Sequence, residues 1–247
     1  MNDCHLITPE YIKSKSNKII VSYLREKEID TNNIFIFDLM DIYETVIYPE
    51  YEFQLKTNYD LGDIEGQKIL GKTIFSEKLI LIDKSISLVN KDPRFIFTLG
   101  HEIGHVVLHN ENDLQNPTTI KTLSGTKDVI ELQANRFAEN LIMPDNYVKQ
   151  FIVQYFNLRK PFKYFGAQEY NFKGRKIKVN SYKEFCEVIA YYLRKYFSNV
   201  SKASLGIKIS TIGLIDNRTN ETINENIYDA LLKKIGFSDN TGEKNFN

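Results

Sequence analysis

The residues with the clearest chemical signature in this chain are two histidines that flank a glutamate, in the pattern His101-Glu102-x-x-His105. Asp92 and Pro93 precede them, and an aspartate followed by a proline is a typical helix start, so we predict a helix over residues 93–109. Residues four apart lie on one face of a helix, with Cβ atoms about 5–6 Å apart, so both imidazoles can bind one metal ion. Zinc suits this pair because its catalytic sites use neutral histidine nitrogens and leave one coordination position for water.

Glu102 lies beside His101 at the edge of the same helix face, where its carboxylate can reach a water molecule without binding the ion. A metal ion lowers the pKa of water to about 7, and such a carboxylate can accept the proton and later donate it. The pattern therefore predicts a metal-assisted hydrolase. The alternative is a pair of hydrogen-bonded core histidines, but the apolar flanks of the motif and the presence of only four histidines in the chain favour the metal site.

His109 continues the spacing of four residues, yet helix geometry argues against it as the third ligand. A rise of 1.5 Å per residue places His109 about 12 Å along the helix axis from His101, too far for one small ion. We interpret His109 as a residue at the C-terminal end of the helix that bonds the last carbonyl groups, with a catalytic role as the alternative.

A better candidate for the third ligand lies in a second predicted helix, which starts near Thr126 or Asp128 and ends before Pro144. Its Glu131, Ala134, Asn135 and Ala138 share one face, and the alanines allow a neighbouring helix to approach closely. Gly100 and Gly104 offer a similar small surface beside the histidines. If the two helices cross there, Glu131 completes a site of two histidines and one glutamate, and Asn135 can orient one imidazole. The alternative for Glu131 is a solvated acid in the first turn of a helix.

The sequence FTLGHEIGHVVLH followed by ELQANRFAENLIMP resembles two helices of the ImmA/IrrE family of metallo-endopeptidases. The pair of motifs is far more specific than either alone. The resemblance assigns three metal ligands and one catalytic acid/base to this chain: His101, His105 and Glu131 as ligands, and Glu102 as the acid/base. Gln133 departs from the pattern, because many members of the family have a second glutamate there.

Composition limits the environment of the protein. The 247 residues are 42% hydrophobic and carry a formal net charge of zero, which gives no overall positive field for nucleic acid or acidic membranes. Cys4 and Cys186 are too few for a disulfide framework. No apolar run approaches the roughly 20 residues of a membrane span, and MNDCHLITPE does not resemble a signal peptide. We predict a cytoplasmic protein without a membrane segment or direct nucleic-acid binding.

The region before the histidine motif is predicted to hold two helices and a hairpin. Thr8-Pro9-Glu10 starts a helix that ends near Glu28. Residues 34–43 form a second helix, with a buried strand as the alternative because the apolar run is dense. Residues 72–75 and 79–83 form a β-hairpin entered at Gly71. In the ImmA/IrrE family a small antiparallel sheet precedes the active helix and its edge can receive an extended substrate. The resemblance implies that residues 79–82 can pair with a peptide backbone, but we favour ordinary core packing for their side chains.

The region after Pro144 begins with an amphipathic helix that ends before Pro161. Residues 159–178 then contain seven Lys or Arg and one acid, with aromatic residues interleaved. We interpret this stretch as a solvated hairpin that turns at Lys173-Gly174, with substrate docking and nucleic-acid binding as alternatives.

The C-terminal region is predicted to be helical. Ser181 and Glu184 form a capping box for a helix to about Phe197. Residues 200–214 resemble a short helical segment of the family, and residues 223–235 form a last helix that Gly236 caps.

Together these elements predict an α+β fold that is mainly helical. A zincin-like metallopeptidase domain with a small antiparallel sheet spans 1–158, a basic and aromatic hairpin or insertion spans 159–180, a helical C-terminal module spans 181–236, and a polar tail spans 237–247.

We therefore expect a zinc endopeptidase that hydrolyses one protein partner. The family resemblance implies that the partner is a helix-turn-helix transcriptional repressor, and that cleavage relieves repression in a phage, mobile element or bacterial stress circuit. The alternative is a toxin or regulatory binding protein of a toxin-antitoxin or phage system with little or no proteolysis. A hydrogen-bond donor for the developing oxyanion is also needed, and Tyr164 and His109 are the candidates.

Overall fold

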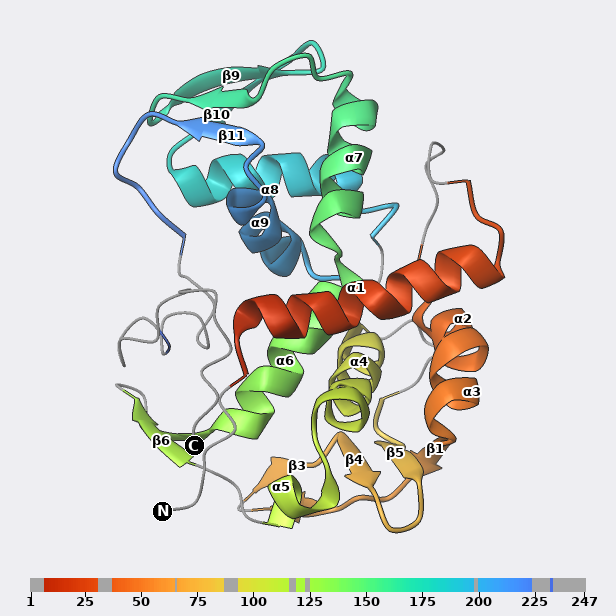
Figure 1. Ribbon diagram of the computed structural model, residues 1–247. Coiled ribbons are helices and arrows are strands. Elements are labelled where there is room, and N and C mark those ends of the chain that lie inside the picture. The colour runs from red at the N-terminus through yellow and green to blue at the C-terminus, as the bar shows by residue number, and fades with distance from the viewer. Residues whose placement is uncertain are drawn as a thin grey trace, which may run out of the picture.

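The structure is a computed structural model that describes residues 7–30, 37–64, 66–86, 93–115, 119–122, 125–197, 200–223 and 232. It confirms the predicted α+β class, in which helices predominate over several small sheets (Figure 1). Two clusters of buried apolar side chains hold it together. The first is built around a three-stranded sheet and three helices, α1 (Pro9–Glu26), α4 (Pro93–Leu108) and α6 (Val129–Ile142). The second is built around α7 (Asp145–Phe156), α8 (Tyr182–Leu193) and α9 (Lys202–Thr211).

Helix α1 (Pro9–Glu26) begins where the sequence predicts, because the Thr8 hydroxyl accepts a hydrogen bond from the backbone N–H of Tyr11 at 3.0 Å. Its apolar side, which includes Ile12 and Ile19, is buried in the first cluster. In Figure 1, α1 lies between α7, α8 and α9 above it and α4 with the sheet below it.

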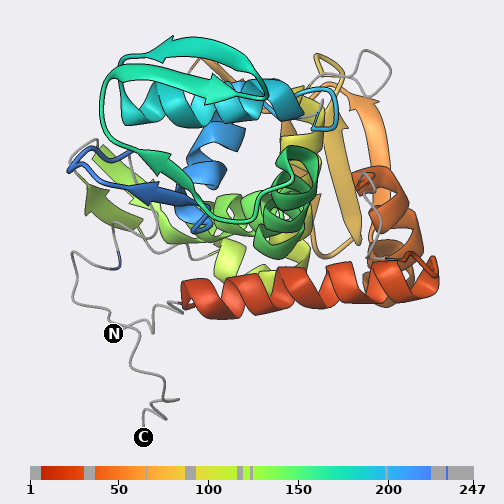
Figure 2. The same cartoon turned by 90° about the horizontal axis from the view of Figure 1, so that it is seen from above.

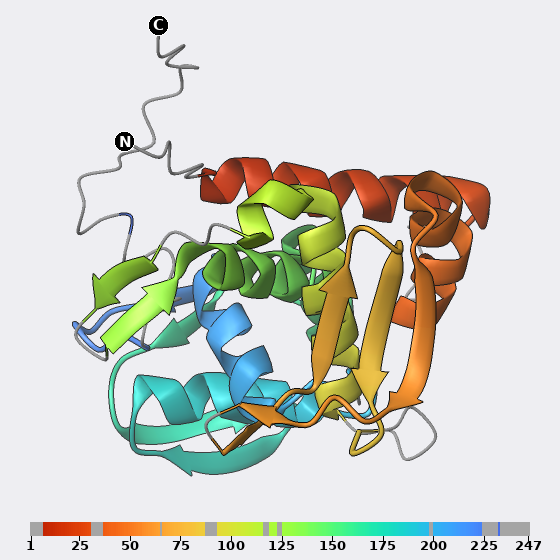
Figure 3. The same ribbon diagram turned by 90° about the horizontal axis from the view of Figure 1, so that it is seen from below.

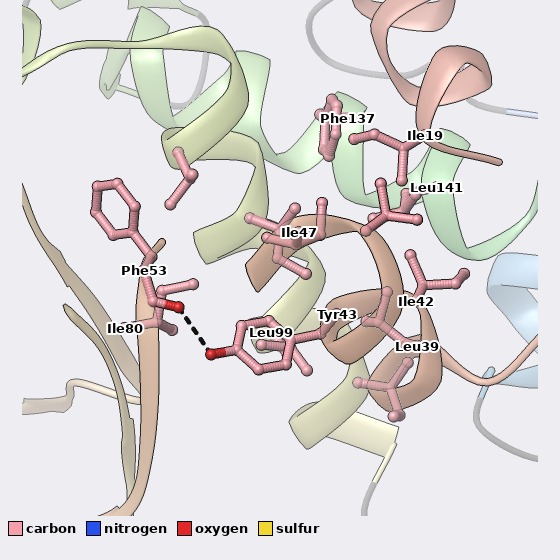
Figure 4. Close-up of a cluster of buried hydrophobic side chains, with 14 of the residues drawn as sticks. Ile19, Leu39, Ile42, Tyr43, Ile47, Phe53, Ile80, Leu99, Phe137 and Leu141 are labelled. Carbon is pink, nitrogen blue, oxygen red and sulfur yellow. Dashed lines mark hydrogen bonds between the residues drawn. The ribbon is translucent and has the colours of Figure 1, made fainter. Parts of the chain in front are cut away.

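The second predicted helix extends well past residue 43. It starts as α2 (Leu39–Ile42), widens into the π-helical turn η1 (Tyr43–Ile47), and ends as α3 (Tyr48–Tyr51). Pro49 lacks a backbone donor and its ring crowds the carbonyl four residues earlier, so a wider turn accommodates it. The buried side of this segment packs against the sheet, and the Tyr43 hydroxyl donates a 2.7 Å hydrogen bond to the Phe53 carbonyl (Figure 4). Residues 34–36 of the predicted helix lie outside the described residues.

The principal sheet has the strand order β1-β5-β4 (Figure 3). The predicted hairpin is confirmed as β4 (Gly71–Ile74) and β5 (Leu79–Asp83), which pair antiparallel. Strand β1 (Gln54–Tyr59) pairs parallel to β5, so this sheet is mixed and not purely antiparallel. The sequence did not predict β1 because its side chains are mostly polar and exposed. Since β5 has a strand on each side, the expectation that residues 79–82 pair with a peptide is wrong, and the edges of the described sheet are β1 and β4.

Three shorter features complete the first half of the chain. Strands β2 (Asp63–Ile64) and β3 (Gln67–Lys68) pair antiparallel, as do β6 (Thr119–Thr122) and β7 (Gly125–Asp128). Helix α5 (Glu111–Gln115) follows directly after α4 (Pro93–Leu108).

The second cluster contains the basic hairpin. Strands β9 (Gln168–Phe172) and β10 (Arg175–Val179) pair antiparallel, and Lys173 and Gly174 both have positive φ angles, 51° and 83°, as a two-residue hairpin turn requires. This confirms the predicted hairpin, which runs along α8 in Figure 2. Phe172 is fully buried, so it faces the core and does not form a stacking platform for bases.

The remaining elements of this half are helices α7 (Asp145–Phe156), α8 (Tyr182–Leu193) and α9 (Lys202–Thr211), and the parallel pair β8 (Phe162–Tyr164) and β11 (Ile215–Asn217). The Ser181 hydroxyl caps α8 by accepting from the Glu184 backbone N–H at 3.2 Å, as predicted. The predicted last helix, 223–235, and the tail, 237–247, lie almost wholly outside the described residues; Leu232 is described and packs in the first cluster.

None of the helices in the described part of the chain combines the length and apolar character that a bilayer crossing requires.

Candidate metal centre

The candidate centre lies where α4 crosses α6 (Val129–Ile142). The Asp128 side chain caps α6 by accepting from the Ile130 N–H at 2.9 Å. The two helices pack through small residues, as predicted. A Cβ atom added at Gly104 would lie 3.0 Å from the Ala134 backbone, and one added at Gly100 would lie 3.3 Å from the Ala138 Cβ. These pairs run in opposite sequence directions, so the helices are antiparallel and the histidine face of α4 lies beside the start of α6.

This crossing brings three predicted ligand residues together: His101, His105 and Glu131. The two histidine Nε2 atoms are 3.0 Å apart. The Glu131 carboxylate oxygens lie 3.1 Å from the His101 Nε2 and 3.3 Å from the His105 Nε2. A tetrahedral zinc with bonds of roughly 2.0–2.1 Å places its ligand atoms about 3.3 Å apart, so the observed separations fit such an ion.

Hydrogen bonds orient both imidazoles with Nε2 toward this point. The His101 Nδ1 is 2.9 Å from the Asn135 Oδ1, which can only accept, so the His101 proton is on Nδ1. Asn135 therefore contacts the His101 imidazole, as the sequence analysis expects. With Nδ1 protonated, the His101 Nε2 lone pair is available to a cation.

His109 performs the same task for His105, which sequence reasoning missed. The His109 Nε2 is 3.0 Å from the Gln133 Oε1, and the His109 Nδ1 is 3.0 Å from the His105 Nδ1. Gln133 accepts from His109 at Nε2, so the His109 Nδ1 accepts the His105 Nδ1 proton and leaves the His105 Nε2 lone pair free of hydrogen. The interpretation of His109 as a residue that bonds the last helix carbonyls is wrong, since its ring bonds side chains. Its position four residues after His105 was the available signal.

Charge at the centre favours a cation. Burial opposes ionisation of Glu131, but the two neighbouring histidines hold its pKa well below the ordinary value of 4.5. Burial alone would lower the pKa of His101, yet the nearby carboxylates of Glu131 and Glu102 raise it on balance. Burial and the neighbouring His105 lower the pKa of His109 to about 4, so this ring is neutral near pH 7. The centre thus carries an anionic carboxylate and attracts positive charge.

Glu102 lies beside the ligand group in a buried position and is only 5% exposed. The Thr73 hydroxyl donates to its Oε2 at 2.7 Å, and strand β4 approaches so closely that a Cβ at Gly71 would lie 2.5 Å from its Oε1. A side chain at position 71 would therefore collide with Glu102, and this lack of space explains the glycine, since its backbone does not have the positive φ that favours glycine. Burial raises the pKa of the Glu102 carboxyl above its usual range.

Tyr164 does not reach this centre. It is fully buried in the second cluster, and its hydroxyl donates to Glu221 at 2.8 Å. The suggestion that Tyr164 stabilises an oxyanion is therefore wrong. His109 is also occupied, because both of its ring nitrogens are used by His105 and Gln133.

Two histidines and a glutamate that converge from crossed helices, with a second buried glutamate beside them, have the form of a metallohydrolase centre. Residues 66–171 match the Peptidase_M78 family through its IrrE N-terminal-like domain, a stretch that includes both helices of the centre. This match confirms the ImmA/IrrE resemblance over residues 66–171 and supports a metallopeptidase function. Searches of curated proteins and of solved structures gave no significant match.

Proposed function

We propose that this protein is a zinc-dependent endopeptidase in which His101, His105 and Glu131 hold the metal and Glu102 is the catalytic acid/base. The observation that carries the proposal is the convergence of the three residues. The two Nε2 atoms are 3.0 Å apart, each lies 3.1–3.3 Å from one of the two Glu131 carboxylate oxygens, and a neighbour orients each imidazole. When bound, zinc at such ligands supplies Lewis acidity to a carbonyl oxygen and lowers the pKa of water.

Glu102 moves the proton in this proposal. Its Oε2 is engaged by Thr73, so Oε1 is the oxygen that accepts a proton from water as the water oxygen bonds to the scissile carbonyl carbon. The same Oε1 then donates this proton to the amide nitrogen as the carbon–nitrogen bond breaks, and Glu102 returns to a carboxylate. Burial raises the pKa of Glu102 above its usual range, which favours its return of the proton to the amide nitrogen.

Edge strand β4 is the proposed docking site for the substrate backbone. It lies against α4, where Gly71 and Thr73 approach Glu102, so a peptide paired to its outer edge passes beside the proton-transfer group. Strand pairing binds any sequence in extended form, which fits a protein substrate.

The proposed substrate is one intracellular protein, a helix-turn-helix repressor, whose cleavage relieves transcription in a phage, mobile element or stress circuit. The ImmA/IrrE resemblance supports this choice, and the zero net charge gives no reason to expect the enzyme itself to bind DNA. We propose also that the protein is cytoplasmic. The same proposal divides the chain into a metallopeptidase domain at 1–158 and a C-terminal module at 181–236.

Metal binding is tested first, by zinc affinity of the full chain in competition with a chelator. Glu131→Gln is expected to weaken zinc binding by more than the roughly 10–100-fold that loss of an outer-shell partner costs, because its carboxylate is proposed as a direct ligand. Glu10→Gln is the matched control, because Glu10 is an exposed first-turn acid on α1. Equal zinc affinity in both variants would show that Glu131 is a solvated helix-start acid and not a ligand.

Proteolysis is tested by incubating the zinc-loaded protein with the repressor encoded beside its gene and identifying fragments by mass spectrometry. Wild type is expected to cleave the repressor and Glu102→Gln to leave it intact. Tight binding of the repressor by wild type without cleavage would instead support the regulatory binding protein. Rapid hydrolysis of unrelated peptides would support a non-specific peptidase.

A further inference from the structure

Helix α4 is buried on nearly all sides, and its exposed residues are therefore informative. Within residues 95–106, all of which the structure describes, every side chain is buried except those of Phe97 and His101. Phe97 is 41% exposed. Residues four apart share a helix face, so the aromatic ring and the proposed metal ligand occupy the same open face, one turn apart.

The surroundings of α4 show what this open face is. One flank of the helix packs on α6 through Gly100 and Gly104, and another packs on β4 through Thr98 and Glu102. Positions 97 and 101 lie between these two flanks on a helix of 3.6 residues per turn. The open face therefore lies between α6 and β4, beside the strand edge where we place the substrate.

The spacing along the helix fixes which part of the substrate Phe97 can contact. Four residues at 1.5 Å each place Phe97 about 6 Å along the axis from His101. An extended peptide advances about 3.4 Å per residue, so Phe97 lies one or two substrate residues from the scissile bond.

Burial of an aromatic ring is favourable, and the exposed ring of Phe97 does not gain this free energy from folding. An apolar side chain of the substrate that packs on the ring would bury its surface, so binding would gain it. We propose that Phe97 forms an apolar subsite that binds an aliphatic or aromatic substrate side chain within two residues of the cleaved bond. This inference rests on the proposed peptidase function.

The test uses small hydroxamic acids, which bind a zinc ion without being cleaved, and the zinc-loaded full chain. Acetohydroxamic acid has no side chain, 4-methylpentanohydroxamic acid has a branched aliphatic one, and 5-aminopentanohydroxamic acid has a cationic one. Dissociation constants are measured by calorimetry for wild type, Phe97→Ala and Phe97→Glu. Phe165→Ala is the matched control, because Phe165 is 58% exposed on the loop between β8 and β9.

Wild type is expected to bind the aliphatic probe about tenfold more tightly than acetohydroxamic acid, as burial of a few carbon atoms implies. Phe97→Ala should reduce this ratio to about threefold or less, and Phe97→Glu should transfer the preference to the cationic probe. Phe165→Ala should keep the wild-type ratio. Acetohydroxamic acid should bind all four proteins equally, which shows that the metal centre is intact.

The proposal is overturned if wild type shows no preference for the aliphatic probe, or if Phe97→Ala keeps the preference. It is also overturned if both Phe97 variants fail to fold, because Phe97 would then be a structural residue. Peptide cleavage measured in parallel separates the two hypotheses. A wild-type protein with the preference but without cleavage refutes the peptidase, whereas cleavage without the preference refutes only the subsite.

Discussion

Gly104 offers the sharpest test of how the helix crossing creates the metal centre. Alanine in a helix interior is more favourable for helix formation than glycine by about 1 kcal/mol, so Gly104→Ala would stabilise an isolated helix. Here the added methyl group would lie 3.0 Å from both the Cα and the carbonyl oxygen of Ala134, which are backbone atoms that no rotamer change can move. Overpacking of this kind costs typically 1–3 kcal/mol. We expect a net loss of about 1 kcal/mol in the free energy of unfolding.

Gly100→Ala is the matched control on the same helix and in the same interface. Its methyl group would meet the end of the Ile142 side chain at 3.2 Å and the Ala138 Cβ at 3.3 Å, and the isoleucine can adjust. The gain in helix propensity should then equal or exceed the cost of the added methyl contacts. Gly100→Ala should therefore be neutral or increase the free energy of unfolding by up to about 1 kcal/mol. The two variants should differ by about 2 kcal/mol in urea unfolding of the metal-free protein.

The Gly104 substitution should also weaken metal binding. Glu131 lies one turn before Ala134 on α6, so separating the helices moves its carboxylate away from the imidazoles. We expect zinc affinity to fall roughly tenfold or more in Gly104→Ala and to stay at the wild-type value in Gly100→Ala. If the two variants prove equally stable and bind zinc equally, the close contact at Gly104 does not set the geometry of the centre.

Three further predictions concern other parts of the molecule. Glu102→Gln should keep wild-type zinc affinity while lowering the initial rate of substrate hydrolysis by roughly 10²–10⁴, and a loss of bound zinc would contradict its role as a non-ligand. Gln133→Leu should weaken zinc binding roughly 10–100-fold in chelator competition, because it removes the acceptor that fixes the His109 tautomer; unchanged affinity would refute that arrangement. Asp145 is buried in part, but Lys208 at 2.6 Å and a second lysine hold its pKa below the ordinary 3.8. It therefore stabilises the fold above that pH and loses its contribution as the pH falls. Asp145→Asn should be less stable near pH 7 by about 3 kcal/mol, because Lys208 is only 7% exposed, and its unfolding free energy should fall less steeply than that of wild type between about pH 5 and 3. Parallel pH profiles would contradict this assignment.

Several features of the fold follow from local sequence. A hydroxyl or carboxylate at Thr8, Asp128 or Ser181 accepts a hydrogen bond from the first turn of its helix, and this interaction depends only on neighbouring residues. The hairpin turn at Lys173-Gly174 is local for the same reason. These elements were therefore predictable without knowledge of the rest of the chain.

Other features depend on packing between distant segments. Strand β1 carries polar side chains and pairs with β5 through its backbone, which leaves no apolar periodicity to detect. Tyr164 was a plausible catalytic donor from its residue type, but the second cluster buries it completely. The exposure of Phe97 could not be predicted either, because the residues around it have the apolar pattern of a fully buried helix.

Helix geometry alone places His101 and His105 on one face with Glu102 at its edge, because it fixes the relation between residues four apart. Small residues on two helices also indicated which faces meet, and hence Glu131 as the proposed third ligand. Tertiary packing was needed to bring each histidine Nε2 within 3.1–3.3 Å of a Glu131 oxygen and to let His109 and Gln133 fix the tautomer of His105. Those relations depend on the approach of one helix to another, which the packing of the whole core sets.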